Sequence, residues 1–133
     1  MRYMLDTNIC IYLMKNDPPQ VRTRLQALSF GAVVMSVVTL AELKCGVSER
    51  GDDGARVAAT LERLLGFVPA LPFDDSAADC YATLYQAARK RRSDALDRLI
   101  AAHALAADCT LVTHNVADFR DYPGLRIEDW TTA

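Results

Sequence analysis

Hydrophobic residues along this chain fall into two alternating kinds of segment. A continuous apolar run at residues 32–37 suits a strand buried on both faces, a shorter apolar run at 3–5 suits a short buried strand, and a further strand is expected at 110–113. Longer segments, in which apolar residues recur at helical spacing, cover residues 8–15, 20–28, 38–48, 55–65, 77–91 and 93–107. Strands that alternate with helices favour a parallel sheet with helices on both faces.

Two weaker extended segments complete the expected sheet. The segment 67–73 contains Pro69 and Pro72, and proline cannot donate a ladder hydrogen bond, so we expect an edge strand there. A short last strand is expected at 125–127, after a loop at 114–119. We therefore predict one α/β domain over residues 1–133, a three-layer α/β/α sandwich with a mostly parallel central sheet.

Composition and charge narrow the class of protein. The 133 residues are 51% hydrophobic and 24% charged, which is ordinary for a globular domain. A net charge of -2 excludes an overall basic field for nucleic acid, although a local basic patch beside an acidic site remains compatible with it. We expect neither a signal peptide nor a membrane span. Cysteines 10, 45, 80 and 109 lack metal-site spacing, which indicates reduced core thiols in a cytoplasmic protein.

An acid follows the first apolar run directly. In the segment Tyr3–Asn8, Asp6 comes after the expected strand, and Thr7 or Asn8 is suited to cap the next helix. Ligands and chemistry collect at the carboxyl edge of open α/β sheets. Asp6 is therefore the first candidate functional residue.

Three further acids occupy comparable positions, each with a simpler structural interpretation. Glu42 follows Thr39 at the spacing of a capping box, which taken alone is the favoured interpretation. Asp97, three residues after Asp94, suits the negatively charged first turn of a helix. Asp118 taken alone is an ordinary loop acid.

These acids share a location, because each follows a strand or starts the helix after one. In a parallel sheet such positions converge on one edge. Four carboxylates in one pocket repel each other unless a cation neutralises them. Oxygen ligands without Cys or His suit Mg²⁺ or Mn²⁺, and such a site activates water and stabilises charge on a phosphodiester.

Several motifs in this order resemble the PIN-domain ribonucleases, and more narrowly the VapC-type toxins of type II toxin–antitoxin pairs. They are Leu5-Asp6-Thr7-Asn8, Ser36-x-x-Thr39-x-Ala41-Glu42-Leu43, Asp97-x-Leu99-Ile100-Ala101-Ala102, Leu111-Val112-Thr113-x-Asn115-x-x-Asp118-Phe119 and Leu125-x-Ile127-x-Asp129-Trp130. The resemblance implies a Mg²⁺-dependent endoribonuclease that acts on RNA, and a homodimer. It also implies a cognate antitoxin that plugs the site with its C-terminal tail, and contact with DNA only through that antitoxin.

The resemblance also implies roles for particular residues. Asp6, Glu42, Asp97 and Asp118 would form a catalytic acidic quartet. Asp6 and Asp97 would be the principal metal ligands, with Glu42 and Asp118 as further ligands. Hydrogen-bonding groups that orient carboxylates or water would be Thr7, Thr113 and Asn115.

The approach to the third acid departs from the family pattern, which often has a Gly-rich loop there. Here a basic run, Arg89, Lys90, Arg91 and Arg92, precedes Asp94, which could compete for the metal. The run either complements a helix C-terminus or steers RNA phosphates towards the acids. His103 is interpreted as packing, and His114 lacks an orienting partner in the sequence, so neither is given a catalytic role.

Two other functions fit parts of the pattern. An aspartyl-phosphate phosphotransferase would use Asp6 as nucleophile, but such sites usually carry a second Asp two residues later, where this chain has Asn8. A non-catalytic partner in an antitoxin repressor complex would need no acidic quartet.

Overall fold

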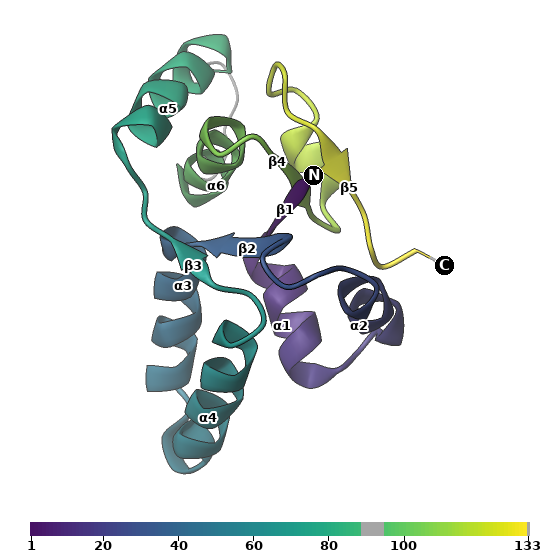
Figure 1. The fold of residues 1–133 in the computed structure, drawn as a ribbon. Coiled ribbons are helices and arrows are strands. Elements are labelled where there is room, and N and C mark those ends of the chain that lie inside the picture. The colour runs from purple at the N-terminus through teal and green to yellow at the C-terminus, as the bar shows by residue number, and fades with distance from the viewer. Residues whose placement is uncertain (89–94, 133) are drawn as a thin grey trace.

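Five parallel strands form the central sheet of the computed structural model, which describes residues 1–88 and 95–132 (Figure 1). In chain order they are β1 (Arg2–Leu5), β2 (Val33–Ser36), β3 (Ala70–Leu71), β4 (Cys109–Val112) and β5 (Ile127–Glu128). Their spatial order is β3-β2-β1-β4-β5, so β1 is central and the proline-flanked β3 is an edge strand as expected. The register pairs Leu5 with both Met35 and Val112.

The helices follow the predicted order with small shifts in their ends. They are α1 (Thr7–Lys15), α2 (Pro19–Gln26), α3 (Val37–Ser48), the 3₁₀ turn η1 (Gly51–Asp53), α4 (Gly54–Leu65), α5 (Asp75–Ala87), α6 (Ala95–Ala106) and α7 (Val116–Phe119). Helix α7 replaces part of the loop expected at 114–119. The basic run Arg89–Arg92 and Asp94 lie outside the described residues. No described helix has the length and hydrophobicity to cross a bilayer.

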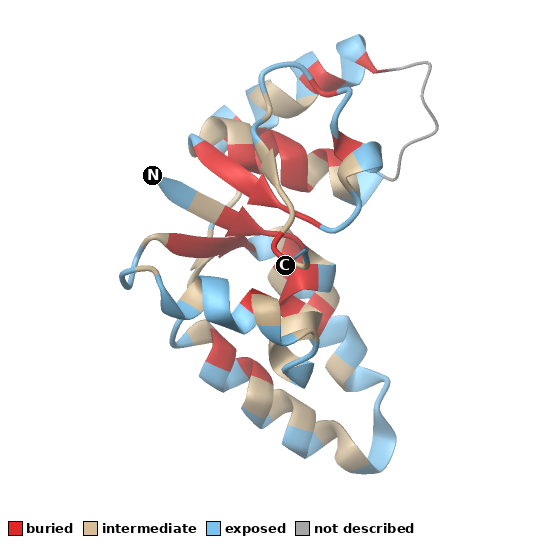
Figure 2. Ribbon diagram, turned by 90° about the vertical axis from the view of Figure 1, so that its right-hand side faces the viewer, coloured by how far each residue is buried: buried red, intermediate tan, exposed pale blue. Residues whose placement is uncertain are grey.

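Alternate residues of each central strand face two separate cores. Met4, Val34 and Leu111 pack with residues of α5, α6 and α7. Leu5, Met35 and Val112 pack with residues of α1 to α4. Figure 2 shows the buried strands between these two helical layers. The α/β/α sandwich is thereby confirmed, because period-two alternation gives each sheet face its own apolar set.

All four cysteines are free thiols, as expected, but they are not all in the core. Cys10 and Cys109 are buried, Cys80 is half-buried and Cys45 is exposed. The expectation of core thiols is therefore wrong for Cys45. In helix α3 only Thr39 and Leu43 are buried, and Cys45 lies on the exposed side of the helix.

The N-caps of two helices differ from those expected. Asp6 itself caps α1, with its Oδ1 accepting the Ile9 N–H at 2.9 Å, so the expected Thr7 or Asn8 cap is wrong. Ser36 caps α3 by accepting the Val38 N–H at 3.1 Å. In both places the strand passes into the helix without a loop, so the residue at the strand end becomes the cap.

Candidate functional site

Asp6 lies at the carboxyl end of the central strand and is almost fully buried, with 6% of its surface exposed. Its carboxylate accepts hydrogen bonds from the Ile9 N–H and the Thr113 side chain. Burial raises the pKa of Asp6, with smaller contributions from the negative charges of Glu42 and Asp129, although the two hydrogen bonds lower it. A cation beside this carboxylate would offset the cost of its buried charge.

Glu42 joins the site through a contact with α1. Thr7 Oγ1 donates a hydrogen bond of 2.6 Å to Glu42 Oε1, and the Thr39 hydroxyl lies 3.4 Å from Thr7 Oγ1. Because Ser36 caps α3, Thr39 lies inside the helix, and the predicted Thr39–Glu42 capping box is wrong. Glu42 therefore has no capping role to explain its position beside Asp6.

Thr113 holds the other side of the Asp6 carboxylate. It is fully buried, and its Oγ1 accepts the Asn115 N–H at 3.0 Å while its hydroxyl contacts Asp6. These contacts suit the orienting role expected of Thr113, which stays a prediction. Asn115 is exposed and contributes its backbone N–H, which donates to Thr113 Oγ1.

Asp97 and Asp118 lie on α6 and α7, in the other helical layer. Asp97 is half-buried in the first turn of α6, which runs antiparallel to β4 and therefore starts at the carboxyl edge of the sheet. Asp118 is exposed in α7, shortly after the end of β4. Asp6 directly follows β1, and the helices that carry Glu42 (α3) and Asp97 (α6) contribute to the cores on opposite faces of the sheet.

The start of α6 is anchored against α5 by Arg98, the residue after Asp97. The Arg98 guanidinium lies 5.7 Å from the centre of the Tyr81 ring and 5.2 Å from that of Tyr85, and only 6% of Arg98 is exposed. Cation–π contacts of this kind are strongest when the cation is desolvated. They fix the backbone from which Asp97 projects.

The fit of a metal ion rests on the chemistry of the donors. Among residues 1–88 and 95–132, no three His, Cys, Asp or Glu side chains are grouped to hold a metal ion. Mg²⁺, however, usually keeps several waters and binds through one or two carboxylates. Asp6 suits such an ion because its carboxylate is buried next to two other negative charges. Mg²⁺ or Mn²⁺ binding stays a prediction.

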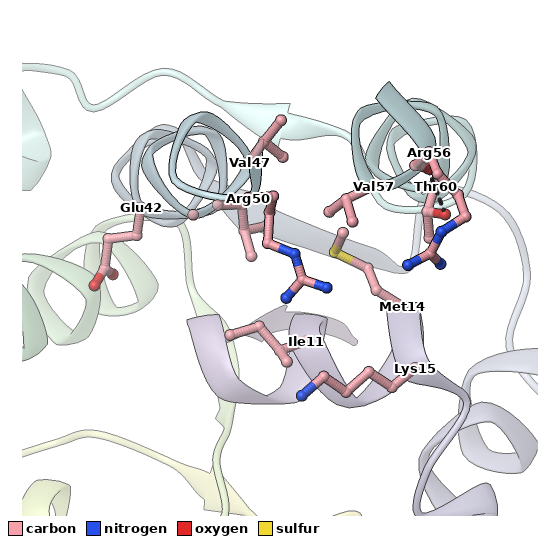
Figure 3. Close-up of a pocket in the computed structure, with 11 residues that line it drawn as sticks. Ile11, Met14, Lys15, Glu42, Val47, Arg50, Arg56, Val57 and Thr60 are labelled. Atoms are coloured by element: carbon pink, nitrogen blue, oxygen red, sulfur yellow. Dashed lines mark hydrogen bonds between the residues drawn. The ribbon is translucent and has the colours of Figure 1, made fainter. Parts of the chain in front are cut away.

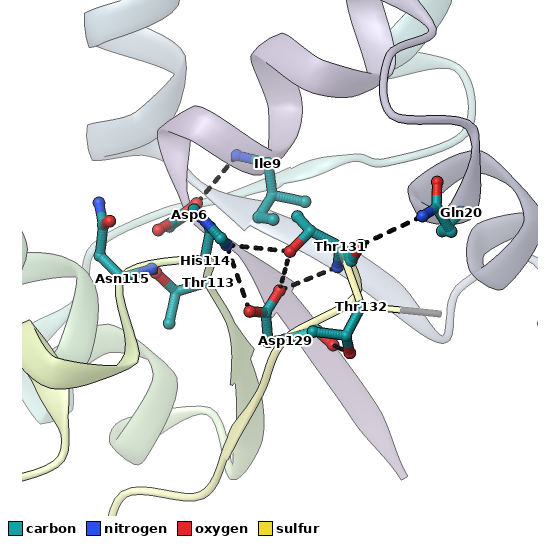
Figure 4. Close-up of polar contacts among 9 residues, drawn as sticks. All are labelled: Asp6, Ile9, Gln20, Thr113, His114, Asn115, Asp129, Thr131 and Thr132. Atoms are coloured by element: carbon teal, nitrogen blue, oxygen red, sulfur yellow. Dashed lines mark hydrogen bonds and ion pairs between the residues drawn. The ribbon is translucent and has the colours of Figure 1, made fainter.

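A second polar group beside the site was not predicted (Figure 4). The imidazole Nδ1 of His114 lies 3.2 Å from Asp129 Oδ2 and 2.9 Å from Thr131 Oγ1. The statement that His114 lacks an orienting partner is therefore wrong. Asp129 directly follows β5, so the criterion that selected Asp6, an acid directly after a strand, could also have selected Asp129. Glu128 pairs with Val112, which places Asp129 level with Thr113.

His103 does more than pack. It is buried, its Nδ1 lies 2.7 Å from Ser36 Oγ, and it is hydrogen-bonded to the backbone of Pro72. Proline has no N–H, so the Pro72 carbonyl accepts a ring N–H and Nδ1 is left to accept the Ser36 hydroxyl proton. Burial lowers the pKa of His103, which suits this neutral ring. His103 thereby holds the start of α3, the helix that carries Glu42.

A groove begins at Glu42 and runs between α1, α3 and α4 (Figure 3). Its volume is about 490 Å³. Apolar side chains line its walls, among them Ile11, Met14, Val47 and Val57, and its basic side chains are Lys15, Arg50 and Arg56. Arg50 and Arg56 both pair with Asp53, at 2.7 Å and 3.0 Å. The groove is thus apolar and basic, with a carboxylate at one end.

Comparison with known proteins gives consistent relatives over the whole chain. The PIN domain family model matches residues 3–125. The tRNA(fMet)-specific endonuclease VapC of Shigella flexneri is 37% identical, over 98% of this chain and 99% of its own. Ribonuclease VapC1 of Haemophilus influenzae (strain R2866) is 38% identical over the same shares.

Solved structures agree with these relatives. VapBC2 from Rickettsia felis, bound to a DNA fragment from its promoter, contains a chain with a TM-score of 0.90 and 32% identity, covering 98% of this chain and 99% of that one. VapBC-1 from nontypeable Haemophilus influenzae contains a chain with a TM-score of 0.89 and 36% identity, covering 99% of this chain and 100% of that one.

Proposed function

This chain belongs to the PIN domain family, among the VapC ribonucleases, and from this we propose that it is a Mg²⁺-dependent endoribonuclease, the toxin of a type II toxin–antitoxin pair. The structural observation that supports the proposal is the buried Asp6 carboxylate at the end of the central strand, with Glu42 and Asp129 as negative neighbours. A phosphotransferase is disfavoured by the family membership and by Asn8.

Asp6 and Asp97 would hold the ion, with Glu42 and Asp118 as further ligands. A bound Mg²⁺ supplies an activated water and positive charge for a phosphodiester. The residues of the chain orient these acids: Thr113 holds the Asp6 carboxylate by a hydrogen bond. Because Asp6 is almost fully buried, solvent screens its charge only weakly.

The RNA class follows from the relatives as a proposal. The relatives from Shigella flexneri and Salmonella typhimurium are named tRNA(fMet)-specific endonucleases, so initiator tRNA is the first candidate substrate. The basic run Arg89–Arg92 would attract RNA phosphates towards the acids, by counterion release. It precedes α6, the helix that starts with Asp97 in its first turn.

The proposed partner is a cognate antitoxin. Structural neighbours at 32% and 36% identity are VapBC complexes, one of them bound to promoter DNA. We expect this chain to form a homodimer and to contact DNA only through its antitoxin. The groove beside Glu42 suits an amphipathic antitoxin segment with acidic residues, because its walls are apolar and it carries Lys15, Arg50 and Arg56.

A cleavage assay tests the proposed function. Antitoxin-free protein is incubated with total RNA in Mg²⁺, in Mn²⁺, or in excess EDTA, and the new 5′ ends are sequenced. We expect discrete cuts, including cuts in initiator tRNA, that EDTA abolishes and added Mg²⁺ restores. Asp52→Asn, on the 3₁₀ turn η1, is the control acid variant and should cut normally. Undiminished cleavage in EDTA would contradict the metal-dependent mechanism.

A further inference from the structure

The ring of His114 is held in one orientation and one tautomer (Figure 4). Its Nδ1 faces Asp129 Oδ2 at 3.2 Å and Thr131 Oγ1 at 2.9 Å. The single hydroxyl proton of Thr131 is donated to Asp129 Oδ1 at 2.6 Å, so Thr131 Oγ1 presents a lone pair to the ring. With acceptors on both sides, Nδ1 must carry a proton, and the other nitrogen, Nε2, is the one that can exchange protons.

The support for this ring is rigid. Trp130, next to Asp129, is fully buried, and its indole N–H donates to Glu128 Oε1 at 3.1 Å. The same Glu128 oxygen accepts from Arg24 at 2.9 Å. Gln20 donates to the Thr131 carbonyl at 3.3 Å. The C-terminal segment is thus fixed to α2 on one side and holds Asp129 against the ring on the other.

The ring also lies at the edge of the acidic site. His114 directly follows Thr113, whose side chain is hydrogen-bonded to Asp6. Asp129, which contacts the ring, is close enough for its charge to act on Asp6. The His114 side chain is 53% exposed, and no residue in the described part of the chain is hydrogen-bonded to Nε2. An RNA bound over Asp6 can therefore reach Nε2.

The proposed hydrolysis needs a proton that the acids are poorly suited to give. A ribose oxygen that leaves phosphorus as an alkoxide is strongly basic, and a positioned general acid lowers the barrier to its departure. Asp129 is ionised, because hydrogen bonds from Thr131 and His114 outweigh the opposing effect of its partial burial and hold its pKa below the usual value. The Asp129 carboxylate on Nδ1 orients the ring and leaves Nε2 as the nitrogen that can exchange protons.

Resting on the ribonuclease function proposed above, we propose that His114 is a catalytic residue, the general acid that protonates the departing ribose oxygen. Water adds its oxygen to phosphorus and gives up a proton to solvent. The bond from phosphorus to the ribose oxygen breaks, its electron pair stays on that oxygen, and the Nε2 proton moves to it. The ring is left neutral, and its Nδ1–H remains hydrogen-bonded to Asp129 and Thr131. Nε2 recovers a proton from solvent before the next turnover.

A sulfur-substituted substrate separates this role from a structural one. The substrate is an oligoribonucleotide that spans a cleavage site mapped with the wild type, with sulfur in place of the leaving ribose oxygen. A thiol ionises far more readily than an alcohol, so its departure needs no general acid. His114→Gln should lower single-turnover cleavage of the all-oxygen RNA by about 10²- to 10⁴-fold and leave cleavage of the sulfur-containing RNA close to wild type.

Asp129→Asn, which keeps the shape but not the charge beside Nδ1, should give a smaller loss that is also confined to the all-oxygen RNA. Equal losses on both substrates would overturn the proposal, and so would full activity of His114→Gln on the all-oxygen RNA. His114→Asn is the second variant, and thermal melts of each variant exclude unfolding. If the wild type and Asp6→Asn cleave each of the two RNAs at the same rate, the proposed ribonuclease function itself fails, whatever the His114 variants do.

Discussion

Thr7 Oγ1 donates a hydrogen bond of 2.6 Å to Glu42 Oε1, across 35 residues of sequence. The contact joins the first turn of α1 to α3 directly beside Asp6, the N-cap of α1. The hydrogen bond orients the Glu42 carboxylate and fixes its position relative to Asp6.

Replacing Thr7 with Val keeps the shape of the side chain and removes this donor. We expect catalytic activity to fall about 10- to 100-fold, the usual cost of losing a group that orients a metal-binding carboxylate. Thr7→Ser keeps the hydroxyl and should stay close to the wild type. Single-turnover RNA cleavage at saturating Mg²⁺ measures both variants, and equal rates for Thr7→Val and the wild type would contradict the orienting role.

Asp6→Asn should separate activity from stability. Activity should fall by at least about 100-fold, because the buried charge that would bind the cation is lost. Stability at pH 7 in EDTA should rise, since Asn also caps helices and carries no buried charge. The pKa of Asp6 is raised in the folded state, so the wild type loses stability as pH rises from 3.8 through that raised value.

Chemical unfolding of both proteins between pH 4 and pH 8 checks the sign. The difference in free energy of unfolding between Asp6→Asn and the wild type should grow as pH rises and then level off. A difference that is flat with pH, or a variant less stable than the wild type at pH 7, would mean that the Asp6 charge is not destabilising.

Metal binding should be visible without RNA. Mg²⁺ or Mn²⁺ should raise the Tm of the wild type, because a ligand at 100 times its Kd adds about 2.7 kcal/mol to the stability of the folded state. Asp6→Asn should show little increase. KCl at matched ionic strength is the control for screening. The metal assignment would be wrong if both proteins, or neither, responded to Mg²⁺ more than to KCl.

His103 should make the fold sensitive to acid. Its pKa is lowered from 6.5 by burial, so the unfolded chain takes up a proton before the folded protein does. Stability is therefore unaffected well above pH 6.5 and is lost as pH falls below it. His103→Gln should lack this loss, at a cost of about 1 kcal/mol at pH 8 for the weakened contact with Ser36.

Urea unfolding of the wild type and His103→Gln at pH 8 and at pH 5.5 measures this effect. The wild type should lose more stability than the variant between the two pH values. Parallel losses would place the acid sensitivity elsewhere in the chain. Because Ser36 caps the helix that carries Glu42, the RNA cleavage rate of the variant at pH 8 also reports whether α3 has moved.

The order of strands and helices could be predicted because it depends on local pattern. The continuous apolar segments at 3–5 and 32–37 match β1 and β2 in the centre of the sheet, and Pro69 and Pro72 correctly marked β3 as an edge. The errors lie at element ends. Strands that pass straight into helices made Asp6 and Ser36 the caps, and this depends on how the chain turns at the sheet edge.

The sequence by itself determined that Asp6 and Asp118 follow strands and that Asp97 lies at the start of a helix, because hydrophobic periodicity distinguishes strand segments from helical ones. Only the tertiary structure decided which hydrogen-bonding partners these residues take. Glu42 could bond to Thr39 within its own helix or to Thr7 on another, and packing of α1 against α3 selected Thr7. His114 acquired Asp129 and Thr131 because β5 pairs with β4 in parallel register, a contact between segments that no local pattern records.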